Sequence, residues 1–185
     1  MSKWKKIGIG AAAAIVVLLI VIATRPDTYR VERSATISAS PDVVYAQVAD
    51  FHKWGAWAPW FKLDPNIKLT YGGTQGTVGA SYAWTGNDEV GQGEMIVLAV
   101  DQNKRLDFNL HFIKPFDSAA KNGFVFEGTG KETKVTWSME GTNNFMSKAM
   151  CLVMDMDKMI GKDFEKGLAQ LKQIAEAAPA PAAAN

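Results

Sequence analysis

Apolar side chains recur at every second position in four runs between residues 80 and 139. The alternating runs are Ala80, Tyr82 and Trp84; Leu106, Phe108, Leu110 and Phe112; Phe124 and Phe126; and Val135, Trp137 and Met139. Successive side chains of a β-strand point to opposite faces, so each run predicts a strand with one apolar face. Turn-forming residues at 85–88, 101–104 and 128–130 separate the runs within hairpin length. The pattern predicts an antiparallel meander whose apolar face must be covered.

A long amphipathic segment near the C-terminus can supply that cover. Residues 145–174 contain no proline and repeat apolar residues at spacings of three and four, which predicts one helix of about eight turns. Upstream, residues 29–38 read as a strand. Ser40 and Pro41 then suit the start of a helix over 42–49. The predicted fold class is α+β.

An uncharged apolar run covers residues 7–24. As a helix it would be about 27 Å long, close to the thickness of the hydrocarbon core of a bilayer. We interpret it as an uncleaved single-pass membrane anchor, with a cleaved secretory signal or a buried core helix as alternatives. Lys3, Lys5 and Lys6 precede the run, which favours an extracytoplasmic domain. The expected organisation is an anchor over 1–26, one domain over 27–174 and a disordered Ala/Pro-rich tail over 175–185.

Charge and composition exclude several function classes. Of the 20 Lys and Arg residues, three lie before residue 25, so the rest of the chain is slightly acidic and has no basic surplus for nucleic acid. The single cysteine, Cys151, cannot form an internal disulfide. Two histidines and one cysteine are too few for the usual zinc ligand sets.

Several short motifs accompany this order of elements. They are Trp54 to Trp60 (WGAWAPW), Asp64-Pro65, Tyr71 to Gly73, Trp84 to Asn87 (WTGN), Val135 to Met139 (VTWSM) and Met159 to Glu165 (MIGKDFE). Over residues 30–174 the chain resembles the START-like (SRPBCC) superfamily, in particular its bacterial polyketide cyclase/dehydrase-like branch. The resemblance implies a helix-grip (START/Bet v 1-like) fold. In that fold a curved, seven-stranded antiparallel sheet packs on a long C-terminal helix, with a hydrophobic cavity between them.

The apolar side chains at alternate positions of the strands would form the wall of such a cavity. Methionines crowd the first half of the C-terminal helix, and flexible thioethers accommodate variable ligands. The tryptophans at 54, 57 and 60 could form a lid, a membrane contact or a cluster that pins the loop to the sheet. The predicted ligand-binding residues are Trp57, Trp60, Tyr82, Trp84, Phe108, Leu110, Phe112, Phe124, Phe126, Trp137, Met139, Met150 and Met154. The alternative for each is plain core packing.

The sequence offers no convincing group of catalytic residues. We predict no catalytic residue, no metal ligand and no cofactor. Asp107, Asn109 and His111 alternate with the apolar residues of the same strand. They should therefore lie on its opposite face and point to solvent. The preferred hypothesis is a membrane-tethered domain that binds a hydrophobic small molecule or lipid. A polyketide cyclase/dehydrase-type enzyme is an alternative and would need a polar group in the cavity, for which Tyr82 and Glu94 are candidates. An envelope domain that recognises another protein is the third hypothesis.

Overall fold

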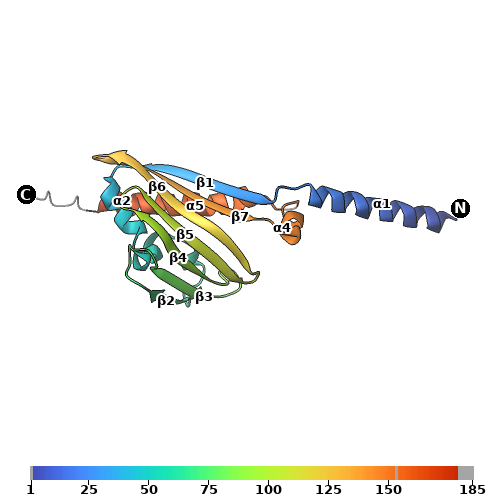
Figure 1. The fold of residues 1–185 in the computed structure, drawn as a ribbon, viewed down its shortest axis with the longest axis horizontal. Coiled ribbons are helices and arrows are strands. Elements are labelled where there is room, and N and C mark those ends of the chain that lie inside the picture. The colour runs from blue at the N-terminus through green and yellow to red at the C-terminus, as the bar shows by residue number, and fades with distance from the viewer. Residues whose placement is uncertain (1, 153, 179–185) are drawn as a thin grey trace, which may run out of the picture.

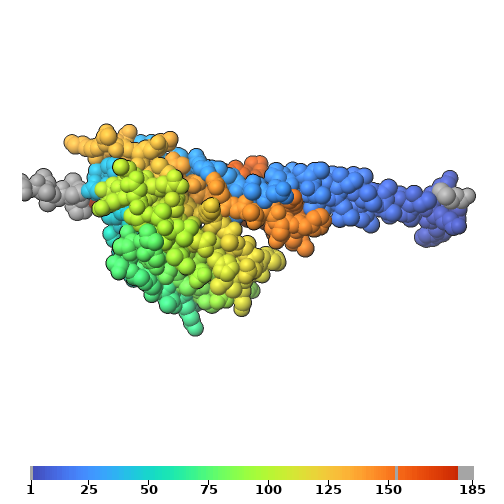
Figure 2. Space-filling view, viewed as in Figure 1, coloured from blue at the N-terminus to red at the C-terminus, as the bar shows by residue number. Residues whose placement is uncertain are grey.

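The computed structural model describes residues 2–152 and 154–178. Helix α1 (Lys3–Ala23) projects away from the body of the domain (Figures 1 and 2). Its side chains are exposed except for Ile22. The helix is long and apolar enough to cross a membrane, on length and composition alone.

Seven antiparallel strands form one sheet, in the order β1-β7-β6-β5-β4-β3-β2. The predicted meander is therefore confirmed, and β1 pairs with β7, the last strand. The strands are β1 (Thr28–Ile37), β2 (Lys68–Gly72), β3 (Ser81–Thr85), β4 (Gln92–Asp101), β5 (Arg105–Lys114), β6 (Ser118–Thr129) and β7 (Glu132–Thr142). The alternating apolar residues all lie on one face of the sheet, whereas Asp107, Asn109 and His111 lie on the other.

Short helices connect β1 to β2. They are α2 (Pro41–Val48), η1 (Phe51–Lys53), α3 (Trp54–Trp57) and η2 (Pro59–Lys62). Helix α3 ends before Pro59 because the residue that precedes a proline is disfavoured in the helical conformation. The indole N–H of Trp54 donates to the carbonyl of Val48 at 2.8 Å. This bond ties α3 to the end of α2.

The prediction of one continuous helix over 145–174 is wrong. The segment forms α4 (Phe145–Met150) and, after a break, α5 (Met156–Ala177). Each helix has its own N-cap, because the side chain of Asn144 accepts from the amide of Ser147 at 2.8 Å and that of Asp155 accepts from the amide of Lys158 at 3.1 Å. Helix α5 also continues past the predicted domain end at 174. The remainder of the predicted tail, residues 179–185, lies outside the described residues.

Helix α5 runs along the apolar face of the sheet (Figure 1). Its buried stripe consists of Phe164, Leu168, Leu171 and Ala175, flanked by the buried glycines Gly161 and Gly167. The expected two-layer arrangement, with α5 on the apolar face of the sheet, is therefore present.

Candidate functional site

Aromatic side chains fill the space between the sheet and α5. The Trp137 ring of β7 stacks on Phe164 of α5, with ring centroids 4.0 Å apart and planes 7° apart. Trp57 meets Trp137 edge to face at 5.7 Å, and Trp54 lies 4.9 Å from Trp57. The two tryptophans of α3 therefore belong to the main core, and neither acts as an exposed lid.

The polar atoms of this core have partners. The Trp137 indole N–H donates to the side-chain oxygen of the buried Asn122 at 2.8 Å. Within the described part of the chain, no buried side-chain nitrogen or oxygen lacks a hydrogen bond. A satisfied, interlocked aromatic core is rigid, so a ligand could enter it only if side chains moved apart.

Most of the predicted ligand-binding residues lie in this core. Nine are buried, namely Trp57, Tyr82, Trp84, Phe108, Leu110, Phe124, Phe126, Trp137 and Met139. Trp60, Phe112 and Met150 are half-buried, and Met154 is exposed. Of the thirteen, only Met154 lines either of the two surface pockets described below. Ligand binding by all thirteen stays a prediction.

The first pocket lies where α1 joins the domain, and we call it the junction pocket. Its volume is about 640 Å³. It is lined by Arg25, Pro26, Thr28 and Tyr29 from the start of β1 and the link before it, by Asn143, Lys148, Cys151, Leu152 and Met154 around α4, and by Asp155, Met156 and Asp157 at the start of α5. Apolar and charged side chains thus meet at the base of α1, a combination that suits an amphiphilic ligand.

Three ion pairs hold the walls of the junction pocket together. The Lys148 ammonium lies 2.5 Å from the Asp27 carboxylate and connects α4 to the link before β1. The Arg33 guanidinium of β1 donates to both carboxylate oxygens of Asp157, at 2.9 and 3.1 Å, and to Glu165 at 2.8 Å. Arg33 thereby fastens the first three turns of α5 to the sheet.

The Arg33 pairing makes a prediction about acid stability. Its guanidinium lowers the pKa of the Asp157 carboxyl below the ordinary value. A depressed folded-state pKa stabilises the fold above the unfolded-state pKa of about 4, and this stabilisation disappears as pH falls through the folded-state pKa. We expect Arg33→Met to melt below wild type at pH 7, and the gap to narrow as the pH falls below the ordinary carboxyl pKa of about 4. Melting curves between pH 2.5 and 7 measure this, with the exposed Lys162→Met as the control. A gap that is independent of pH would contradict the assignment.

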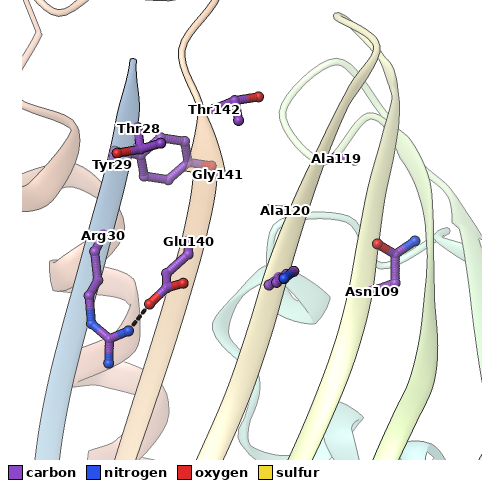
Figure 3. Close-up of a pocket in the computed structure, with 10 residues that line it drawn as sticks. Thr28, Tyr29, Arg30, Asn109, Ala119, Ala120, Glu140, Gly141 and Thr142 are labelled. Carbon is purple, nitrogen blue, oxygen red and sulfur yellow. Dashed lines mark ion pairs between the residues drawn. The ribbon is translucent and has the colours of Figure 1, made fainter. Parts of the chain in front are cut away.

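The second pocket, the strand pocket, shares Thr28 and Tyr29 with the junction pocket. It has a volume of about 680 Å³ and lies over the beginnings of β1 and β6, the end of β7 and the middle of β5. The Tyr29 ring lies against Gly141, where a Cβ in place of the glycine hydrogen would come within 2.6 Å of the ring, and Arg30 pairs with Glu140 (Figure 3). Burial raises the pKa of the Tyr29 hydroxyl, so this group stays neutral at physiological pH.

Neither polar candidate for catalysis lines one of these pockets. Tyr82 is buried among aromatic rings, and its burial raises the pKa of its hydroxyl. Glu94 lies on the outer face of the sheet, with a carboxylate oxygen 3.6 Å from Nδ1 of His111. Within residues 2–152 and 154–178, no three His, Cys, Asp or Glu side chains come together in a group that could hold a metal ion.

A seven-stranded antiparallel sheet packed on a long C-terminal helix is the helix-grip arrangement of SRPBCC proteins. The sequence profile of the family described as "Polyketide cyclase / dehydrase and lipid transport" matches residues 28–176, and the chain belongs to that family. The resemblance noted in the sequence is therefore confirmed. No curated protein matches the sequence.

Solved structures share the fold at low sequence identity. Protein MLL2253 from Mesorhizobium loti has a TM-score of 0.61 and 17% identity, over 82% of this chain and 99% of that one. The Aha1 dimer from Colwellia psychrerythraea has a TM-score of 0.58 and 17% identity, over 80% and 97%. The di-domain ARO/CYC BexL from the BE-7585A biosynthetic pathway has a TM-score of 0.61 and 10% identity, over 95% and 61%. These identities support the fold alone.

Proposed function

We propose that the chain is a membrane-tethered SRPBCC domain that binds a hydrophobic small molecule or lipid without transforming it. The observation that carries the proposal is the place of the junction pocket. It opens at the base of α1, where apolar residues such as Leu152 and Met154 meet Arg25 and Lys148. A lipid has the same division between an apolar chain and a polar head group, and α1 would keep the pocket beside a bilayer.

The positions of the polar candidates favour binding over catalysis. A cyclase or dehydrase needs an acid or base within hydrogen-bond reach of its substrate. The two candidates named from the sequence, Tyr82 and Glu94, lie outside both pockets. The carboxylates that line the junction pocket, Asp155 and Asp157, are paired with Lys158 and Arg33. The family description includes lipid transport as well as cyclisation, and a carrier fits this arrangement better.

The tether has its own test, which needs no ligand. We expect the full chain to stay in the membrane pellet after carbonate extraction, and its intact mass to include residues 7–24. Protease added to sealed cells or vesicles would then digest the domain only if it faces outward. A mature protein that has lost residues 7–24 and is found in the soluble fraction would contradict the tether.

Ligand binding is tested by mass spectrometry and by substitution in the junction pocket. We expect native mass spectra of the detergent-extracted full chain to show a bound apolar molecule, or uptake of an added fluorescent fatty acid. Met154→Glu places a charge in the apolar part of the pocket, because Met154 lines it. It should weaken fatty acid binding about tenfold, which corresponds to ~1.4 kcal/mol.

The matched control is Val78→Glu, an exposed apolar residue on the link between β2 and β3. It should leave binding unchanged. If Met154→Glu binds normally and Phe108→Ala in the core abolishes binding, the ligand lies between the sheet and α5, as the sequence pattern predicts. Absence of any bound or added ligand from the wild-type protein would contradict the proposed function.

A further inference from the structure

Helix α4 presents an apolar surface that no described part of the chain covers. The exposed fractions of Phe145 and Met146 are 53% and 63%. The rest of the helix is half-buried, and the Lys148 side chain is drawn onto the domain by its ion pair with Asp27. The helix is thus fixed by its polar cap and ion pair, while two of its three large apolar side chains, Phe145 and Met146, are exposed.

The position of α4 identifies what covers this surface. Helix α4 packs against α1 and lies at the end of the domain from which α1 leaves (Figure 1). Only residues 24–27 separate α1 from β1, and four extended residues span at most about 14 Å. A bilayer spanned by α1 therefore reaches close to α4.

The strand register brings a further exposed apolar side chain to the same end of the sheet. Thr28 pairs with Thr142, and Phe112 pairs with Ser118, so the β5–β6 turn lies at the end where β1 begins. Phe116 in that turn is 65% exposed. Exposed aromatic and thioether side chains near the end of an apolar helix are typical of a protein surface that enters the lipid interface.

We propose that α4 rests in the surface of the bilayer that α1 spans, with Phe145 and Met146 inserted among the lipids. Leu152 and Met154 follow α4 and line the junction pocket, so this contact holds the mouth of the pocket at the bilayer surface. A lipid then passes into the pocket without crossing water. This inference rests on the proposed membrane tether and adds the surface through which the domain meets the membrane.

The test uses a photocrosslinker in the full chain. The amino acid p-benzoylphenylalanine replaces either Met146 or Val78, whose exposed fractions are both 63%. Val78 lies at the opposite end of the sheet, because Gly72 pairs with Ser81 there. After reconstitution into phosphatidylcholine and phosphatidylglycerol vesicles and illumination, we expect phospholipid adducts at position 146 to exceed those at position 78 at least tenfold.

The outcomes separate this inference from the tether. If the protein resists carbonate extraction from the vesicles but position 146 gives no more lipid adduct than position 78, the contact is wrong and the tether stands. A crosslink from position 146 to a second copy of the chain would also overturn it, because another protomer would then cover α4. Failure of the chain to enter vesicles at all would overturn the tether and this inference together.

A functional variant checks the consequence for loading. Phe145→Ser combined with Met146→Ser keeps the Asn144 cap and the Lys148 ion pair. We expect this variant to stay in the membrane through α1 and to take up a fluorescent fatty acid from vesicles about tenfold more slowly than Val78→Ser. An unchanged uptake rate would show that α4 does not hold the pocket at the lipid surface.

Discussion

Trp137→Ala should lower the free energy of unfolding by about 3–5 kcal/mol, the range for truncating a large buried aromatic side chain. Trp137 is fully buried between Phe124, at a centroid distance of 4.8 Å, and Phe164 of α5, at 4.0 Å. Its removal would open a cavity at the main contact between the sheet and the helix. It would also leave Asn122 without its indole donor.

The measurement is urea unfolding of the full chain in detergent micelles, followed by near-ultraviolet circular dichroism. Trp137→Phe separates packing from hydrogen bonding. It retains a ring against Phe164 and removes the N–H, so we expect about 1–3 kcal/mol. The exposed Phe116→Ala should be nearly neutral. A loss below about 1 kcal/mol for Trp137→Ala would contradict a close-packed interior and would favour a collapsible cavity between the sheet and α5.

The same variant bears on where a ligand binds. A cavity lined only by apolar side chains stays dry and can accept small aromatic molecules. If Trp137→Ala gains affinity for such a molecule while the wild type has none there, then in this chain tryptophan occupies the space that the sequence pattern assigns to a ligand. Alternation identifies which side chains face inward, but it cannot tell whether they meet one another or leave a gap.

Much of the fold is predictable because its strands alternate cleanly. Two strands escape the pattern for physical reasons. In β4, residues 95–100 are continuously apolar. A register shift between Val97 and Ala99 interrupts the alternation of inward-facing and outward-facing side chains. Strand β2 lies at the sheet edge and has no fully buried side chain, so its alternation is weak. The sequence of β4 alone does not reveal which of its apolar residues face outward.

At the C-terminus, the sequence pattern fails mainly because it does not predict the break between α4 and α5. Apolar spacing continues across residues 151–155, which favours an unbroken helix. Asp155 carries the contrary signal, because an aspartate directly before a periodic apolar run is a typical N-cap. The two caps outweigh the spacing, and the break creates part of the junction pocket.

The junction pocket is not predictable from the sequence, because its parts are distant along the chain. Arg33 lies at an inward-facing position of β1, between the inward-facing Val31 and Ala35. A charged side chain at a strand position that otherwise faces the core indicates an oppositely charged partner nearby. The sequence could point to Arg33 on that ground, but its partners Asp157 and Glu165 are more than 120 residues away. Only the tertiary structure identifies them.

Gly167→Leu should destabilise the domain by about 1–3 kcal/mol through overpacking. Glycine inside a helix is less favourable than alanine by ~1 kcal/mol. Its presence here is explained if a neighbouring element lies too close to admit a side chain. A Cβ at this position would lie 2.8 Å from Cζ3 of Trp137 and 3.3 Å from Cδ of Pro59. Both neighbours are held in the core, so neither can yield without moving α5 away from the sheet. The helix, the sheet and the segment that follows Trp57 therefore approach one another closely at this glycine.

Gly161→Leu tests the same principle against a softer neighbour. A Cβ there would overlap the Arg33 guanidinium. That group ends a flexible side chain, although Asp157 and Glu165 hold it in place. We expect a smaller loss than for Gly167→Leu, accompanied by the reduced acid sensitivity of Arg33→Met. The exposed Lys162→Leu should change little, which gives the order Gly167, Gly161, Lys162 in thermal melts. If Gly167→Leu is neutral or stabilising, the glycines serve to bend α5, and close packing against Trp137 is not their cause.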